Sequence, residues 1–425
     1  MYQATTLPNG VRLLTEHIPG VRSAALGFFV GAGSRHETAL ENGAAHFIEH
    51  MSFKGTHSRS AGDLAREMDA IGGQVNAYTT KESTCFYARC LDNHLDRAAD
   101  LLCDMLFASR FDQRDVELER GVILEEIGMY EDTPEDLCAE RLAAAVYKGS
   151  PLARPILGRQ STLESMTGES LLDWQRRHYT GSAMVVSLAG SFTQQQADAL
   201  AQRLSQIPAG DAPKAKPGKY QPAVTARKKA IEQNHLLLAF PALPYTHPDR
   251  YALLLLNSIL GGGCSSRLFQ QLREQRGLCY TVYSYLSDYA DAGLLGIYTA
   301  LNRDQQDAAL ETMISIVRDL TQEGPSQEEL DRARDQAKAN ILMGLESVQA
   351  RMSHLGTSTL LYGRVREPEE ILESYDRVTR EDLRNLARSI FDFPQASLSA
   401  VGRVPSAAFL KESLAKNFAG SSASL

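Results

Sequence analysis

Two histidines and a glutamate stand at a spacing that suits a metal site. The segment His46-Phe-Ile-Glu49-His50 falls in a strongly helical pattern, with Asn42 as its expected N-cap. Positions i and i+4 share one helix face, so both imidazoles point to the same place. Glu49, at position i+3, lies on that face too and can act as a general base without binding the metal.

The same pattern also arises by chance on solvated helices, where it has no function. Here the residues around the three side chains are apolar and include no Lys or Arg. A solvated helix face is usually interrupted by charge, and Phe47 and Ile48 are expected to turn away and anchor the helix in the core. A third ligand would favour the metal site over the solvated helix.

A second helical segment supplies that ligand. Glu119 and Glu126 are seven residues apart, or two helical turns, and therefore face the same way. Val122 and Ile123 lie between them, which predicts that both acids are near a buried surface, where a carboxylate is costly unless it is paired or bound to metal. We predict Glu126 as the third ligand and Glu119 as the residue that orients a ligand. Other acids of this region are expected on solvated faces: Glu117, Glu125, Glu131 and Glu135.

Together these residues resemble the pitrilysin or insulinase peptidases, whose HxxEH motif reverses the commoner HExxH. The similarity is greatest to the subfamily of the mitochondrial processing peptidase and its bacterial relatives. In that group the liganding Glu ends an ERxVIxxE segment, 80 residues after the first His, and Glu126 stands 80 residues after His46. The resemblance extends over nearly the whole chain. It implies a zinc metalloendopeptidase acting on extended peptides or unfolded polypeptides.

The expected cofactor is one Zn²⁺ per chain. Two neutral imidazoles and one carboxylate leave a zinc ion with an open position, where the pKa of water can fall toward about 7. Glu49 is then the expected general base, which takes a proton from water and passes it to the leaving amine.

Four further residues are expected to bind substrate because they match positions of the family. Asn76 and Ala77 stand in a strand that in relatives is an exposed edge and pairs with the peptide backbone. Arg273 and Tyr280 match a pair that in relatives grips substrate and helps to hold the scissile carbonyl. Without the resemblance, these four would be taken for ordinary residues of an internal strand, a helix and a strand.

The chain is predicted to contain two similar α+β domains in tandem. Residues 208–224 have the Pro, Gly, Ala and Lys composition of a linker between domains 1–207 and 225–425. Each half shows strands, an apolar helix, an amphipathic helix and a closing apolar strand in the same order, which favours duplication and mostly antiparallel sheets covered by helices. The resemblance implies that the two domains form half of a clamshell, and only the first has the metal ligands.

Charge and hydropathy exclude other classes of protein. The formal charge of -8 argues against nucleic-acid binding, and no apolar run is long enough to span a membrane. The N-terminal residues lack the pattern of a secretory signal. The six cysteines show no disulfide or CxxC spacing, so reduced packing residues are expected. These features favour a cytoplasmic bacterial protein.

Two questions about function stay open at this point. A non-catalytic structural subunit of the same fold, or a metal-binding protein without peptidase activity, would share much of this sequence. The zinc residues lie in one half of the chain, whereas Arg273 and Tyr280 lie in the other. We therefore expect a homodimer in which each subunit completes the other's site. The alternatives are a monomer completed in cis and a heterodimer.

Overall fold

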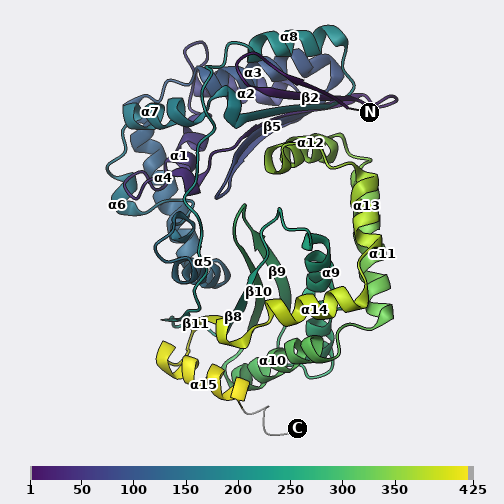
Figure 1. The fold of residues 1–425 in the computed structure, drawn as a ribbon. Coiled ribbons are helices and arrows are strands. Elements are labelled where there is room, and N and C mark those ends of the chain that lie inside the picture. The colour runs from purple at the N-terminus through teal and green to yellow at the C-terminus, as the bar shows by residue number, and fades with distance from the viewer. Residues whose placement is uncertain (1, 420–425) are drawn as a thin grey trace. The chain divides into compact units, whose positions relative to one another are not determined.

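The computed structural model describes residues 2–419, in which the chain forms two compact units (Figure 1). The first comprises the chain up to Ile127, then Arg154–Lys216 and Leu342–Arg366. The second comprises Gly128–Ala153, Pro217–Ile341 and the chain from Glu367 onward. Each unit contains one sheet with helices packed on it, so the predicted α+β class is confirmed.

The first unit contains a six-stranded sheet with strand order β1-β2-β6-β3-β5-β4. All neighbouring strands are antiparallel except β2 and β6, which are parallel. The central strand β3 is apolar and buried along nearly its whole length because helices cover both of its faces. The strands are β1 (Gln3–Thr6), β2 (Arg12–His17), β3 (Ser23–Val30), β4 (Gln74–Thr79), β5 (Thr84–Leu91) and β6 (Met184–Gly190).

The helices of this unit pack on that sheet through an apolar core. Phe28, Phe47 and Trp174 are among the largest side chains that are completely buried there. The helices are α1 (Ala44–Met51), α2 (Ala61–Ala70), α3 (Leu95–Phe107), α4 (Gln113–Asp132), α6 (Gln160–Leu163), α7 (Gly168–His178), α8 (Gln194–Leu204) and α12 (Val348–Tyr362). Helix α4 begins in the first unit and ends in the second.

The second unit contains a five-stranded sheet with strand order β7-β11-β8-β10-β9. Its parallel pair is β7 and β11, and its other pairs are antiparallel. The strands are β7 (Val224–Lys228), β8 (Gln233–Ala242), β9 (Thr281–Asp288), β10 (Gly293–Asn302) and β11 (Ser397–Gly402). The helices are α5 (Pro134–Val146), α9 (Arg250–Gly261), α10 (Gln306–Gln322), α11 (Gln327–Gly344), α13 (Pro368–Asp376), α14 (Arg380–Ile390) and α15 (Ala407–Ala419). Helix α11 begins in this unit and ends in the first.

The two sheets share one topology. The order β2-β6-β3-β5-β4 in the first unit corresponds to β7-β11-β8-β10-β9 in the second, with the parallel pair at the same end. Helix α9 packs against β9 in the second unit, as α1 packs against β4 in the first. This repetition of topology is what a duplicated α+β domain produces.

Each sheet takes one covering helix from the other half of the chain. In the first unit, α12 packs against β3 and β6 and buries Met352 and Leu355. In the second, α5 packs against β8 and β11 and buries Leu142 and Val146 (Figure 1). The units therefore regroup the two halves of the sequence. The domain limits 1–207 and 225–425 stay a prediction.

Three other expectations can be compared with the structure. Residues 208–223 contain neither helix nor strand, and β7 begins at Val224. All six cysteine thiols are free, as expected, and five of them are buried or half-buried. Cys264 is exposed, so the expectation of a packing residue is wrong for that position. Between residues 2 and 419, no helix is both long enough and apolar enough to cross a membrane.

Candidate metal centre and catalytic site

Helix α1 presents the two histidines and Glu49. Phe47 and Ile48 are completely buried, as expected, and fix the helix in the core of the first unit. The rings of His46 and His50 lie side by side, with their centroids 4.6 Å apart. The i,i+4 spacing therefore places both imidazoles at one point beside the core.

The N-terminus of α1 differs from the sequence expectation. Asn42 is not the N-cap; the N-cap is Gly43, whose φ of 104° is in the left-handed region. The carboxylate of Glu37 accepts hydrogen bonds from the backbone N–H groups of Gly43 and Ala45, each at 2.9 Å, and from Asn42 Nδ2 at 3.0 Å. A carboxylate that reaches back over the first turn satisfies the free N–H groups that Asn42 was expected to cap.

Helix α4 places Glu126 and Glu119 against α1. Glu119 is buried, and its Oε2 lies 3.0 Å from His50 Nδ1. Its Oε1 lies 2.5 Å from Nζ of Lys54. Ile123 is completely buried between the two acids, but Val122 is about half exposed, so only one of the two apolar residues faces the core. Glu117, Glu125 and Glu131 are exposed as expected, whereas Glu135 is half-buried and accepts a hydrogen bond from Tyr283.

The convergence of these side chains fits a zinc ion. His46 Nε2 and His50 Nε2 each lie 3.6 Å from Glu126 Oε2. Ligand atoms of a tetrahedral zinc site, bound at about 2.0–2.1 Å, are about 3.4 Å from one another, whereas N–H···O hydrogen bonds are shorter, at about 2.9 Å. Burial and the neighbouring His50 lower the pKa of His46 to about 3. Its imidazole is therefore neutral, which is the form that binds a metal.

This group is isolated within the described chain. Among residues 2–419, His46, His50 and Glu126 form the one group of three His, Cys, Asp or Glu side chains whose ligand atoms lie close enough to share an ion, within 4.8 Å. In helix α9 of the second unit, the stretch 253–259 is mostly apolar and carries no His, Asp or Glu.

Glu49 lies beside the proposed ligands. Its Oε2 accepts a hydrogen bond from Oγ1 of Thr79 at 2.5 Å. The pKa of the Glu49 carboxyl is raised above its ordinary value. Burial and the nearby Glu126 raise it, and they outweigh the lowering effect of the bond from Thr79 and of His50. The Glu49 side chain is half-buried, and the bond from Thr79 orients its carboxylate next to the histidines, as a general base requires.

Strand β4 is the edge strand of its sheet. It pairs with β5 on one side only, and its residues alternate between exposed and half-buried. Asn76 is exposed and Ala77 is half-buried. A free edge of this kind offers unpaired backbone groups to an extended peptide.

Arg273 and Tyr280 come together in the second unit. Arg273 lies in a π-helical turn, Phe269–Glu274, and Tyr280 immediately precedes β9. The Arg273 guanidinium carbon is 4.8 Å from the centre of the Tyr280 ring and 4.7 Å from that of Phe269. Tyr280 is 74% exposed and the side chain of Arg273 is 36% exposed, so the phenol and the guanidinium are both accessible to solvent.

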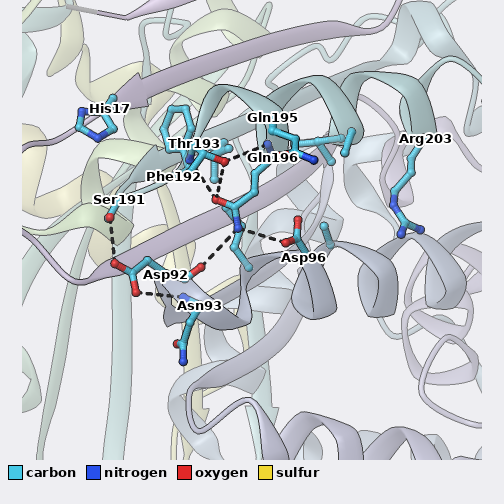
Figure 2. A pocket seen from close by; sticks show the side chains of 15 residues that line it. His17, Asp92, Asn93, Asp96, Ser191, Phe192, Thr193, Gln195, Gln196 and Arg203 are labelled. Atoms are coloured by element: carbon cyan, nitrogen blue, oxygen red, sulfur yellow. Dashed lines mark hydrogen bonds between the residues drawn. The ribbon is translucent and has the colours of Figure 1, made fainter.

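A separate hollow in the first unit contains none of these residues. It is lined by side chains of β2, β6, α3, α8 and the adjoining turns (Figure 2). Its polar groups bond to one another: Asp92 accepts from Ser191 at 3.0 Å, and Asp96 accepts from Gln196 at 3.2 Å. This hollow therefore offers no unpaired acid or nucleophile for the chemistry predicted above.

Three side chains that support the site were not predicted from the sequence. Thr79 bonds the expected base, Lys54 pairs with Glu119, and Glu37 caps helix α1. All three stand close to predicted elements, but no periodic pattern marks them. Only the position of Glu37 ahead of the HxxEH helix offered a signal, because acids favour helix N-termini.

Two family models match the sequence. The one described as "Insulinase (Peptidase family M16)" matches residues 12–160, which contain His46, Glu49, His50, Glu119 and Glu126. The one described as "Peptidase M16 inactive domain" matches residues 165–337, which contain Arg273 and Tyr280. The two matches follow one another along the chain.

Similar proteins extend over most of the chain. An "Uncharacterized zinc protease" of Bacillus subtilis is 41% identical, covering 96% of this chain and 100% of the relative. A protein of the same description from Mycobacterium leprae is 40% identical over 91% of this chain and 89% of its own. Both relatives are thus similar along nearly their whole length.

Solved structures share the fold. The "peptidase M16 inactive domain" from Pseudomonas fluorescens superposes with a TM-score of 0.88 at 21% identity, covering 96% of this chain and 98% of its own. A protease from Helicobacter pylori gives the same TM-score at 19% identity, covering 95% and 99%. At these identities the likeness concerns the fold alone.

Proposed function

Because this chain belongs to the insulinase family of M16 peptidases, we propose that it is a zinc-dependent endopeptidase that hydrolyses extended peptides and unfolded polypeptides. The observation that carries the proposal is the convergence of His46, His50 and Glu126 beside the carboxylate of Glu49. The names of the relatives, which call them zinc proteases, support the metal and the class of reaction.

The proposed ligands of one Zn²⁺ are His46, His50 and Glu126. When bound, zinc supplies a Lewis acid that polarises the substrate carbonyl and lowers the pKa of water. Glu119 accepts a hydrogen bond from Nδ1 of His50, which leaves the lone pair of Nε2 for the metal. His46 contributes a neutral imidazole because burial disfavours its protonation.

Glu49 is the proposed general base. It lies on the ligand face of α1 but is separate from the three ligands, so its carboxylate is free to exchange protons. In the proposed reaction it takes a proton from the attacking water and delivers it to the nitrogen of the leaving amine.

The proposed substrate contacts come from both units. Strand β4, with Asn76 and Ala77, pairs with the backbone of an extended peptide, because its outer edge has no strand partner among residues 2–419. Arg273 holds substrate backbone or carboxylate, and the hydroxyl of Tyr280 stabilises the oxyanion of the scissile carbonyl. Backbone pairing tolerates varied side chains, which suits an enzyme of broad peptide specificity.

The proposal predicts that metal binding and activity separate between variants. Glu49→Gln should retain zinc and lose activity, because the base is not a ligand. His46→Ala and Glu126→Gln should lose both, since each leaves two protein ligands. Elemental analysis of each folded variant, with peptide cleavage followed by mass spectrometry, measures both properties. A folded Glu49→Gln protein without zinc would contradict the assignment of base and ligands.

The same assay distinguishes the peptidase from a non-catalytic subunit of this fold. A wild-type protein that binds zinc but cleaves no member of a peptide library, with or without chelator, would favour the subunit.

We further propose a homodimer with sites completed in trans, with a heterodimer as the alternative, and a cytoplasmic location in a bacterium.

A further inference from the structure

Thr79 joins the edge strand to the base. It is the last residue of β4, and its hydroxyl donates to Glu49 Oε2 at 2.5 Å. Its backbone is fixed by pairing with Thr84 of β5, and the strand as a whole packs against α1. The bond therefore connects two elements with separate roles in the proposed function, the peptide-binding strand and the helix that presents the ligands.

The chemistry of this contact suits a positioning role. A glutamate has three rotatable bonds, and a base that is displaced by about 1 Å can lose about 10²-fold in rate. A threonine restricts its own hydroxyl because branching at Cβ limits the χ1 rotamers. One oxygen of Glu49 is thus held by a donor that is itself rigid, and the hydroxyl can remain the donor when the carboxyl carries a proton.

We propose that Thr79 is the positioning residue of the general base, so that the strand that binds the peptide also sets the orientation of Glu49. This inference rests on the proposed function and extends it to a residue outside the HxxEH motif. The position of the base is thereby linked to that of the peptide, because a substrate paired along β4 lies next to a carboxylate that the last residue of the same strand holds in place.

Two substitutions test the role of the hydroxyl. Thr79→Val keeps the shape and β-branching but removes the donor, whereas Thr79→Ser keeps the donor. We expect Thr79→Val to lower kcat by about 10²-fold with KM within about twofold, and Thr79→Ser to keep most of the activity. Zinc content by elemental analysis should equal that of the wild type in both variants, since the hydroxyl contacts no ligand.

A control variant removes a similar hydroxyl elsewhere. Thr225, in strand β7, is also half-buried and donates to a side-chain oxygen, Ser399 Oγ, at 3.0 Å. Thr225→Val should leave kcat and KM unchanged. If Thr225→Val lowered kcat as much as Thr79→Val does, the effect of Thr79 would be a general loss of rigidity and the positioning role would be wrong.

A measurement without turnover completes the test. Thermal unfolding of the metal-free protein is compared for Thr79→Val, Glu49→Met, which has no oxygen to accept the bond from Thr79, and the double variant. A direct bond predicts that the two single shifts in unfolding midpoint are not additive. Additive shifts with wild-type kcat in Thr79→Val would overturn the inference and leave the peptidase intact. Absence of cleavage by the wild type itself would instead overturn the proposed function.

Discussion

At the scale of single residues, the two proposed histidine ligands are held differently. Nδ1 of His46 is buried and has no hydrogen-bond partner within the described part of the chain, so packing alone orients that ring. Nδ1 of His50 is bound by Glu119, which in turn is paired with Lys54. A buried carboxylate needs such a partner, because an unpaired charge away from water is costly. Lys54 therefore keeps Glu119 in place for His50.

This chain of contacts predicts that Lys54 affects zinc affinity. Lys54→Met should weaken zinc binding by about tenfold, because partners outside the ligand set orient the ligands themselves. Lys54→Arg, which keeps the charge, should restore most of the affinity. Competition with a chromophoric chelator measures the constants directly, without an activity assay.

Lys229 provides the matched control. Its ammonium also pairs with a carboxylate, that of Asp132, but Asp132 is not a residue that orients a proposed metal ligand. Lys229→Met should bind zinc as the wild type does. Equal zinc affinity for Lys54→Met and the wild type would show that Glu119 orients His50 without help.

The proposed ligands were predictable from the sequence, but the residues that orient them were only partly so. His46, His50 and Glu126 stand at helical spacings, and the face of a helix follows from its period of 3.6 residues. The contacts of Thr79 and Lys54 join separate segments of the chain. The helical period predicts which face of a helix a residue occupies, but it does not predict which side chain from another segment lies against that face. Such contacts depend on the fold as a whole.

At the scale of elements, the N-terminus of α1 depends on a glycine and on a buried acid. A Cβ at Gly43 would lie 2.9 Å from Gly158 Cα and from the carbonyl oxygen of Leu157, so the close approach as well as the positive φ requires glycine. The turn this creates directs the first N–H groups of the helix toward Glu37. A buried acid thereby stabilises the element that presents the metal ligands.

The buried carboxylate of Glu37 predicts a dependence of stability on pH. Burial raises its pKa from 4.5 to about 7, against the lowering effect of Asn42, Ala45, Gly43 and Arg154. The folded protein thus binds the proton more tightly than the unfolded chain. The contribution of this group to the free energy of unfolding is fully present below pH 4.5 and is lost as the pH rises to about 7. A difference in pKa of this size corresponds to a loss of about 3 kcal/mol.

Glu37→Gln removes this titration. The unfolding free energy of the wild type minus that of the variant, from urea denaturation of metal-free protein, should fall by about 3 kcal/mol from pH 4.5 to pH 8. Other titrating groups are common to both proteins and cancel. Glu41→Gln is a control of opposite sign: burial raises the pKa of Glu41, but hydrogen bonds from Thr38 and Arg177 outweigh it and leave that pKa below its ordinary value. A difference that does not change with pH would contradict the raised pKa of Glu37.

The elements themselves were largely predictable, and their grouping was not. The sequence predicted strands, then an apolar helix, and a closing apolar strand in each half. The order β3, α1, β6 in the first unit and β8, α9, β11 in the second confirms this. The apolar faces of α5 and α12 indicate burial, but not which sheet they cover. Because both sheets are apolar on both faces, each can accept a helix from the other half of the chain.

At the scale of the whole molecule, the duplicated topology separates two sets of residues. The proposed zinc ligands and Glu49 belong to the first unit, and Arg273 and Tyr280 belong to the second. The second unit repeats the strand order of the first, and its described residues, up to Ala419, hold no comparable group of ligands. If one site needs both sets, a two-fold dimer can complete two sites at once, each with the zinc set of one subunit and the Arg and Tyr of the other.

Complementation between inactive variants tests this proposed assembly. Glu49→Gln and Tyr280→Phe should each be nearly inactive alone, because one lacks the base and the other lacks the phenol that stabilises the oxyanion. When the two proteins exchange subunits at random, half of the dimers are mixed, and each mixed dimer holds one intact site. Activity should then return to about a quarter of the wild-type value. A monomer with its site completed in cis would recover nothing, so verified subunit exchange without any return of activity would rule out completion in trans.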